Sequence, residues 1–313
     1  MKILLVDSVH PSLVNQLTIA GFECHEKYNL TYQDAIAIIP SYEGLIIRSR
    51  FTVDDHFLTT AKKLMFIARA GSGMENIDVA RAQKKGIACI NSPEGNSEPV
   101  GEHALGMILT LLHNIHRAGK EIREGKWDRK GNSPTELMNM TVGIIGYGNT
   151  GSAFARKLHG MGVKVLTYDK FKHDYTDKYV LESTMANLYD LCDIVSFHIP
   201  LTKITRFMAN TEFFEKFRKN IYLINTSRGE VVKTSDLLLA LESGKVVGAC
   251  LDVNEFEDKT FNKLTNVEGN PVWNKLLEKP NVILTPHIAG QSNNSMIRHA
   301  DILYHKIIQM FPH

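Results

Sequence analysis

Short apolar runs alternate with amphipathic segments along the first hundred residues of the chain. The runs are rich in Ile, Leu and Val and lack polar alternation, which is typical of strands buried on both faces of a parallel sheet. The predicted strands are Lys2–Val6, Phe22–Glu26, Gly44–Arg48, Leu64–Ala68 and Ile87–Ile90. With the segments between them, these strands predict a small open α/β sheet.

The segment Asn91–Pro99 breaks this rhythm with two prolines and a glycine, so it predicts a hinge or crossover. A long helix is then predicted from about Val100 to Glu124, because apolar residues recur there at helical spacing. The final amphipathic segment, Ser292–Phe311, predicts a helix that returns to the first domain.

A second α/β unit is predicted from Thr141 onward. Its six strands are Thr141–Ile145, Val163–Tyr168, Ile194–Phe197, Ile221–Ile224, Val247–Asp252 and Val282–Leu284. Six strands suffice for two mononucleotide-binding halves. A ligand is therefore expected at the carboxyl ends of these strands, near the point where the strand order reverses.

The first strand of this unit ends in the pattern Gly146-x-Gly148-x-x-Gly151, and an amphipathic segment follows. Gly146 permits a tight turn, Gly148 lets the backbone approach a pyrophosphate, and Gly151 lets the helix pack close to the strand. The N–H groups at the start of the helix would face the phosphates. The sequence therefore predicts dinucleotide binding.

Asp169 ends the next predicted strand, 18 residues beyond Gly151. An acid about 20 residues on is expected to accept hydrogen bonds from the adenosine ribose. A carboxylate repels the 2′-phosphate of NADP, so NAD is the predicted cofactor. Lys170 and Lys172 follow closely and soften that preference.

Composition narrows the function classes. A chain of 313 residues suits two domains, and a net charge of +2 gives no basic field for nucleic acid. Four scattered cysteines, with no signal peptide and no apolar run long enough to span a membrane, predict a cytoplasmic protein. His113 and His116 share a helix face, but no third ligand accompanies them, so no metal site is expected.

Three polar residues lie just past the ends of late strands, where an α/β enzyme places its site: Arg228, Glu257 and His287. Arginine can hold a carboxylate through two parallel hydrogen bonds, and histidine can pass a proton to a developing alkoxide. A nearby glutamate favours the imidazolium and fixes its tautomer. Taken alone, any one of the 13 histidines is more often a structural or surface residue, Arg228 is also compatible with a solvated cation in a turn, and Glu257 with a solvated charged face.

Several strings closely resemble motifs of the D-isomer-specific 2-hydroxyacid dehydrogenase family, in the family's order. They are Ala70–Asp78, Gly143–Gly151, Asp193–Thr202, Ile221–Glu230, Gly248–Val253 and Pro286–Gly290. The resemblance covers essentially the whole chain. It implies that Arg228 binds the substrate carboxylate and polarises the keto oxygen, and that His287 is the acid/base, paired to Glu257.

The resemblance also implies further contacts. Ser72 and Gly73 match the loop that holds the substrate carboxylate, and Asp252 matches the residue that positions the nicotinamide carboxamide. The remaining cofactor positions are Asn149, Thr150, His198, Pro200, Thr226 and Gly290. The implied fold is α/β with two doubly wound parallel-sheet domains, in which a Rossmann NAD-binding domain is inserted into a flavodoxin-like substrate domain.

The expected boundaries are residues 1–97 plus 288–313 for the substrate domain and 98–287 for the NAD-binding domain. In this family the helix after the hinge forms the surface of a homodimer. No segment follows His313, so a C-terminal regulatory domain is not expected.

The substrate is the least constrained part of the prediction. The string Arg48-Ser49-Arg50 resembles that of 3-phosphoglycerate dehydrogenases, and Arg69 ends the next strand. Arginines here suit a phosphate, which favours 3-phosphoglycerate and serine biosynthesis. If Arg50 is solvated and only Arg48 faces the site, the substrate is glyoxylate, hydroxypyruvate or an uncharged 2-keto acid such as pyruvate.

Two departures from the family and one competing function remain open. No proline follows Glu257, which makes Glu255 the alternative acid, and the segment 258–279 is longer than in the compact family form. A non-catalytic NAD-sensing corepressor uses the same fold and keeps the same three residues. The sequence shows no clear apolar patch for the peptide groove that such a scaffold needs.

Overall fold

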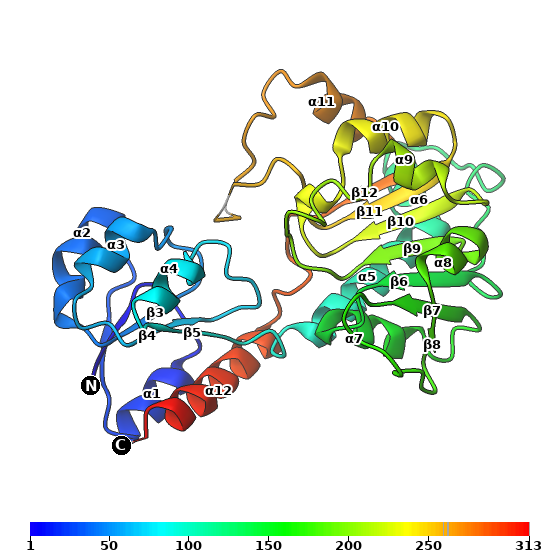
Figure 1. Cartoon of the computed structure of the whole chain (residues 1–313). Helices are drawn as coiled ribbons and strands as arrows, with labels where there is room; N and C mark the ends of the chain where they lie inside the picture. Colours follow the sequence, from blue (N-terminus) through cyan, green and yellow to red (C-terminus); the bar gives the residue numbers. More distant parts are fainter. Residues whose placement is uncertain (259, 262, 313) are drawn as a thin grey trace. The chain divides into compact units, whose positions relative to one another are not determined.

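A computed structural model of the chain describes residues 1–258, 260, 261 and 263–312. It divides into two compact units (Figure 1). Unit 1 comprises Met1–Ser97, Asp258–Lys263 and Gln291–His313, and unit 2 comprises Glu98–Glu257 and Leu264–Gly290. Each unit has its own parallel sheet, so the predicted fold of two parallel-sheet α/β domains is confirmed.

The sheet of unit 1 has five parallel strands in the order β2-β1-β3-β4-β5. Their bounds are β1 Lys2–Leu5, β2 Glu23–Glu26, β3 Gly44–Ile47, β4 Phe66–Arg69 and β5 Ala88–Asn91. This is the flavodoxin-like order. Central strands β3 and β4 are buried on both faces, which explains their continuous apolar runs.

Helices cover this sheet: α1 Pro11–Ile19, α2 Tyr32–Ile38, α3 Asp55–Thr60, α4 Val79–Lys84 and α12 Asn293–Met310, with the 3₁₀ turn η1 Ile39–Ser41. The last helix, α12, packs its buried face against α1 and the strands of unit 1. Its start is fixed by a capping box, in which the Ser292 hydroxyl accepts from the Ser295 backbone N–H at 3.0 Å.

The sheet of unit 2 has seven parallel strands in the order β12-β11-β10-β9-β6-β7-β8. Their bounds are β6 Thr141–Ile145, β7 Lys164–Tyr168, β8 Leu181–Glu182, β9 Ile194–Phe197, β10 Ile221–Asn225, β11 Val246–Leu251 and β12 Val282–Leu284. The chain runs outward from β6 in both directions. The strand order therefore reverses between β6 and β9, where a nucleotide is expected to bind.

The prediction of one long helix from Val100 to Glu124 is wrong. The structure has two helices, α5 Ser97–Leu112 and α6 Ile115–Arg123, separated at Asn114, which adopts a left-handed conformation with φ of 53°. The other helical elements of unit 2 are α7 Asn149–Leu158, α8 Met185–Leu191, α9 Thr211–Glu215, η2 Gly229–Val231, α10 Thr234–Glu242 and α11 Pro271–Leu277.

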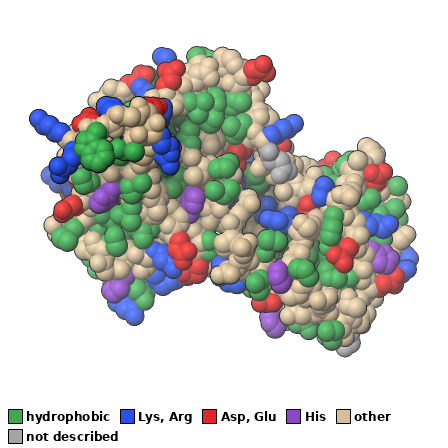
Figure 2. Space-filling model, turned by 180° about the vertical axis from the view of Figure 1, so that it is seen from behind, with side chains coloured by type: hydrophobic (Ala, Val, Ile, Leu, Met, Phe, Trp, Pro, Cys, Tyr) green, Lys and Arg blue, Asp and Glu red, His purple; other side chains and the backbone are tan. Residues whose placement is uncertain are grey.

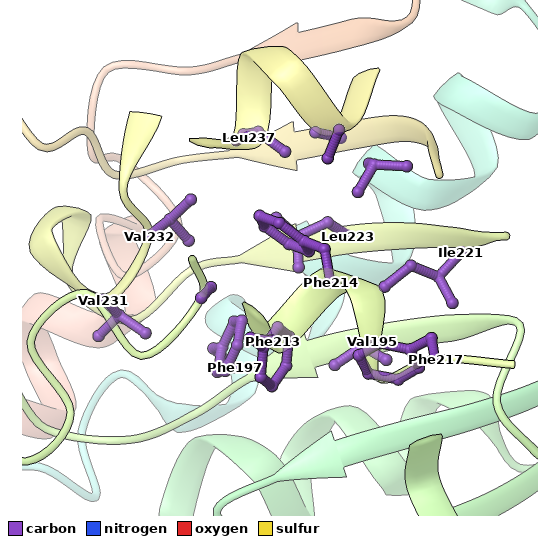
Figure 3. Close-up of a cluster of buried hydrophobic side chains, with 14 of the residues drawn as sticks. Val195, Phe197, Phe213, Phe214, Phe217, Ile221, Leu223, Val231, Val232 and Leu237 are labelled. Atoms are coloured by element: carbon purple, nitrogen blue, oxygen red, sulfur yellow. The ribbon is translucent and has the colours of Figure 1, made fainter. Parts of the chain in front are cut away.

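A phenylalanine-rich cluster fills the space between α9, α10 and the sheet of unit 2 (Figure 3). Phe213, Phe214 and Phe217 pack on Phe197 of β9 and Leu223 of β10. Truncating one such buried ring to alanine costs about 3–5 kcal/mol. This cluster therefore fixes β9, β10 and β11, whose carboxyl ends carry the candidate site.

Acidic and basic side chains are interspersed on the molecular face shown in Figure 2. Among the described residues, no helix is both long and apolar enough to cross a bilayer. In the same part of the chain, no three His, Cys, Asp or Glu side chains are grouped as metal ligands would be.

Candidate active site

The three polar residues expected to carry chemistry lie at one edge of the unit 2 sheet. The loops after β10, β11 and β12 are linked by backbone hydrogen bonds. The Asp252 N–H donates to the Asn225 carbonyl at 3.0 Å, and the His287 N–H donates to the Asp252 carbonyl at 2.7 Å. The structure thus brings the loops of Arg228, Glu257 and His287 together.

His287 pairs with Glu257. The distance from His287 Nδ1 to Glu257 Oε2 is 2.6 Å, and the two side chains are 26% and 11% exposed. The other carboxylate oxygen, Oε1, accepts from the Asn254 backbone N–H at 2.5 Å. Glu255 is used elsewhere, because its Oε2 accepts from the Thr234 N–H at the start of α10 at 2.7 Å. The geometry therefore associates Glu257, and not Glu255, with the histidine.

Arg228 lies in a tightly held turn after β10. Its carbonyl accepts from Asn225 Nδ2 at 2.9 Å, and its Nη1 donates to the Ser227 carbonyl at 2.6 Å. The next residue must be glycine, because a Cβ on Gly229 would lie 1.9 Å from the carbonyl oxygen of Asn254. This close approach brings the arginine turn against the loop that leads to Glu257.

Asp252, which is 1% exposed, organises the histidine loop. Its Oδ1 accepts from the Ile288 N–H at 2.9 Å and from the Thr285 hydroxyl at 2.5 Å, while its Oδ2 accepts from the Ala289 N–H at 2.9 Å. His287 itself has a φ of 54°, a conformation that costs a non-glycine residue energy. The bonds to Asp252 on either side of His287 stabilise that conformation.

His103 of α5 adds a further contact to this network. Its Nε2 lies 3.0 Å from Thr285 Oγ1 and 3.5 Å from Asp252 Oδ1. Sequence reasoning missed His103 and Thr285, since neither lies in a recognisable motif. The available signal was a histidine within the apolar pattern of α5.

The glycine loop has the geometry that a pyrophosphate needs. Gly146 has a φ of 95°, and a Cβ there would lie 2.4 Å from the His198 carbonyl oxygen. A Cβ on Gly151 would lie 2.0 Å from the Gly146 carbonyl oxygen, whereas one on Gly148 would meet nothing within 4 Å. Helix α7 begins at Asn149 with no side-chain cap, so its N–H groups suit a phosphate.

The carboxylate of Asp169 lies beside this loop. Its Oδ2 accepts from the Tyr147 N–H at 2.8 Å, and its Oδ1 accepts from the N–H groups of Phe171 and Lys172 at 2.8 and 3.1 Å. Burial acts to raise the pKa of Asp169, but these N–H groups and the Lys172 charge outweigh it and lower that pKa. The carboxylate stays ionised and keeps acceptor capacity for a ribose hydroxyl.

His198, buried after β9, reaches the start of α7. Its Nδ1 lies 3.2 Å from the Thr150 hydroxyl and its Nε2 lies 2.8 Å from the Ser196 hydroxyl. Burial lowers the pKa of His198 to about 3, so the ring is neutral and orients Thr150. The Thr226 hydroxyl is buried and has no hydrogen-bond partner among the described residues, which fits a group that a bound dinucleotide would satisfy.

Two other expected cofactor residues lie in loops at the same sheet edge. Pro200 follows β9, and its carbonyl accepts from the Thr205 hydroxyl at 2.7 Å. Gly290 follows the histidine loop at the end of unit 2. Together with the glycine loop, Asp169 and the orphaned Thr226 hydroxyl, these residues fit an NAD molecule.

In unit 1, the loop Arg48-Ser49-Arg50 is held by an acid that sequence reasoning missed. Oδ2 of Asp7 accepts from the backbone N–H groups of all three residues, at 2.6, 3.0 and 3.0 Å. The Arg50 guanidinium pairs with the same carboxylate at 3.4 Å and donates to the Val6 carbonyl. The signal was available, because Asp7 directly follows a buried strand.

Arg69 and the loop after it are fastened to their neighbours. Arg69 is 9% exposed, and its Nε donates to the Arg48 carbonyl at 3.1 Å and to Asn76 Oδ1 at 3.2 Å. The loop that holds Ser72 and Gly73 is pinned to β5, because Asn91 Nδ2 donates to the Ser72 carbonyl at 2.5 Å. The expected substrate residues of unit 1 thus share the carboxyl ends of β3, β4 and β5.

Residues 105–289 match the family model described as D-isomer specific 2-hydroxyacid dehydrogenase, NAD binding domain. The chain belongs to this family. The predicted resemblance is thereby confirmed, and so is NAD as the cofactor.

Known relatives differ in their substrates. The chain is 32% identical to D-3-phosphoglycerate dehydrogenase of Archaeoglobus fulgidus, over 99% of this chain and 57% of that protein. It is 35% identical to hydroxypyruvate reductase of Thermotoga maritima, over 90% of this chain and 89% of that protein. The chain thus spans little more than half the length of the archaeal relative.

Among solved structures, the chain resembles D-lactate dehydrogenase from Aquifex aeolicus complexed with NAD and lactic acid. The TM-score is 0.82 and the identity 27%, and the match covers 99% of this chain and 95% of that one. The similar proteins thus include enzymes named for phosphorylated acids and enzymes named for unphosphorylated acids.

Proposed function

We propose that the protein is an NAD-dependent oxidoreductase that interconverts a D-2-hydroxy acid and its 2-keto acid. The observation that carries this proposal is the His287–Glu257 pair, at 2.6 Å, on the strand-end edge of the sheet that also holds the glycine loop. A proton donor beside a dinucleotide site is the combination that carbonyl reduction requires.

When bound, NAD would supply the hydride-transfer chemistry for the C2 carbon of the substrate. Arg228 donates hydrogen bonds to the substrate carboxylate and polarises the keto oxygen. Glu257 holds His287 through Nδ1, so proton exchange with the substrate oxygen occurs at Nε2. In the reducing direction, His287 gives its proton to the oxygen as C2 accepts the hydride.

We propose 3-phosphoglycerate and 3-phosphohydroxypyruvate as the substrate pair, with a role in serine biosynthesis. Support comes from the arginines at the strand ends of unit 1 and from the phosphoglycerate dehydrogenase relatives. A hydroxypyruvate reductase is the second candidate, because that relative is matched over 89% of its own length.

The test is NADH oxidation, followed at 340 nm, with 3-phosphohydroxypyruvate, hydroxypyruvate, glyoxylate and pyruvate, and with NADPH in parallel. We expect kcat/KM for the phosphorylated acid to be at least about 10² above the others, since an arginine pair with phosphate is a strong charge-assisted interaction. Preference for an unphosphorylated acid would select the second candidate. No turnover of any 2-keto acid would reject the proposed activity.

A homodimer formed through the segment after the hinge is also proposed. The apolar face of α5 is buried within unit 2, but Ile115 and Ile122 of α6 and Trp127 beyond it are 58%, 53% and 79% exposed. Exposed apolar groups of this kind mark association surfaces. Light scattering of the purified chain at micromolar concentration tests this, and a monomer mass would reject it.

A reducing, cytoplasmic location is proposed from the cysteines. All four are free thiols, two of them buried and two partly buried. Labelling of thiols in protein taken directly from cells tests the redox state.

A further inference from the structure

A set of cationic side chains converges at one place in unit 1. Strands β3, β4 and β5 are neighbours in the sheet. Ile47 of β3 pairs with Arg69 of β4, and Arg69 pairs with Asn91 of β5. Arg48 directly follows β3, and Ser92 directly follows β5. The strand ends therefore place Arg48, Arg69 and Ser92 side by side.

Helix α12 contributes to the same place from the far end of the sequence. His299 Nδ1 lies 2.7 Å from the Ser92 hydroxyl, and Arg298 Nε donates to the Gly95 carbonyl at 2.9 Å. The fit is close, because a Cβ on Gly95 would lie 2.4 Å from His299 Nδ1. Two consecutive residues of α12 are thus fastened to the turn that follows β5.

Three arginines lie near enough to His299 to affect its protonation. Burial, together with the positive charges of Arg48, Arg69 and Arg298, lowers the pKa of His299 to about 4 against the opposing effect of a hydrogen bond to the Ser92 backbone. The imidazole is therefore neutral at physiological pH. It therefore adds no positive charge to that of the three arginines.

The nearby acids Asp7 and Glu94 have other partners. Asp7 accepts from the loop of residues 48–50 and pairs with Arg50, while Glu94 pairs with Lys306 at 3.0 Å. Arg48 and Arg298 are partly exposed, whereas Arg69 and His299 are each only 9% exposed. Partly exposed cations near a buried cation, Arg69, favour an anion from solution.

We propose that Arg298, together with Arg48, binds a second anionic group of the substrate, at the end remote from its 2-keto acid group. This inference rests on the proposed function and names the substrate class: 2-keto acids with a terminal phosphate or carboxylate. Arg298 is then a specificity-determining residue supplied by the last helix. Its Nε is fixed on Gly95, which leaves the two Nη groups as a fork of donors.

Arg50 is less suited to this role than Arg298. The Asp7 carboxylate pairs with the Arg50 guanidinium and offsets its charge, whereas the only bond of Arg298 just described is to a neutral carbonyl. An arginine bonded to a carbonyl keeps its full charge for an incoming anion.

The test compares kcat/KM for 3-phosphohydroxypyruvate, 2-oxoglutarate and hydroxypyruvate in the full chain and in Arg298→Gln and Arg298→Lys. For each acid with a second anionic group, we compare its kcat/KM with that of hydroxypyruvate. We expect Arg298→Gln to lower this ratio by about tenfold to a hundredfold, the scale of a charged hydrogen bond. Hydroxypyruvate turnover should stay within about threefold. Arg298→Lys should retain part of the ratio, since it keeps the charge but loses the fork.

Arg81→Gln is the matched control, because it removes the same charge from an exposed pair with Asp55 on other helices of unit 1. It should leave the ratio unchanged. In the unmodified chain, the acid with the higher kcat/KM identifies the bound group: 3-phosphohydroxypyruvate indicates phosphate, and 2-oxoglutarate indicates carboxylate. An unchanged ratio in Arg298→Gln, or an equal fall for all three acids, would overturn the inference.

A separate measurement keeps this inference distinct from the proposed activity. If the unmodified chain reduces no 2-keto acid, calorimetric titration with 3-phosphoglycerate and D-glycerate decides. Tighter binding of the phosphorylated acid that is lost in Arg298→Gln and Arg48→Gln, with unchanged thermal unfolding, supports the anion site. Equal binding of the two acids, or no binding of either, overturns it.

Discussion

Replacing Asp252 with asparagine tests how the histidine loop is held. The buried carboxylate accepts from three donors through two oxygens: Thr285 Oγ1 and the N–H groups of Ile288 and Ala289. The asparagine amide has only one acceptor oxygen. Its NH₂ group would therefore face at least one of the backbone N–H groups of Ile288 and Ala289. A buried donor left without its charged acceptor costs about 2–3 kcal/mol. If that cost raises the activation free energy because His287 is less well positioned, kcat falls by about 30- to 150-fold.

The assay measures kcat for hydroxypyruvate reduction, NADH affinity by fluorescence titration, and thermal unfolding. If Asp252 acts mainly by holding His287 in its left-handed conformation, kcat falls while the NADH dissociation constant changes less than about threefold. The role implied by the family, positioning the nicotinamide carboxamide, predicts weaker NADH binding instead. Asp190→Asn, at an exposed pair with Arg218, is the control. Unchanged kcat in Asp252→Asn would refute the reasoning.

Three further results are expected. His287→Ala should lower kcat by roughly 10²–10⁴ with NADH affinity intact, and unchanged turnover would remove His287 from the mechanism. Asp169→Ala should weaken NADH more than NADPH in fluorescence titrations, and equal loss of both would contradict the proposed contact of Asp169 with the ribose. Burial lowers the pKa of His198 to about 3, so the unfolded chain binds the extra proton and the free energy of unfolding rises with pH between about 3 and 6.5. His198→Gln should reduce that slope by up to about 1.4 kcal/mol per pH unit in denaturant titrations at pH 4.5, 5.5 and 6.5, and an unaltered slope would exclude His198 as its source.

Strand positions were predictable because buried parallel strands are continuous apolar runs. Thr141–Ile145, Ile194–Phe197 and Val282–Leu284 were predicted with the bounds that the structure has. Strand β8, Leu181–Glu182, was missed, since two residues at a sheet edge leave no pattern. The break between α5 and α6 was also missed. The apolar spacing continues across Asn114, and only its backbone conformation separates the helices.

Contacts between distant parts of the sequence were the unpredictable part of the candidate site. The sequence left Glu255 and Glu257 as alternative partners of His287. The choice depends on the Thr234 N–H, which engages Glu255 from the start of α10. The bond between His299 and Ser92 likewise joins residues that are 207 positions apart. The sequence near Glu255 or His299 does not indicate these partners, because the packing of whole helices and strands sets where the partners lie.

Substrate choice in this family has to depend on residues other than the three at the strand ends of unit 2. A phosphorylated and an unphosphorylated 2-keto acid present the same carboxylate and carbonyl, so the roles proposed for Arg228 and His287 are the same for both. The two substrates differ by a dianionic group at the other end of a three-carbon chain. Discriminating between them requires cations whose charge is not already offset by a neighbouring acid. In unit 1, Arg50 pairs with Asp7, whereas Arg298 is bonded to the neutral carbonyl of Gly95. The identity of the residue at position 298 is therefore expected to report the substrate class better than the Arg-Ser-Arg string does.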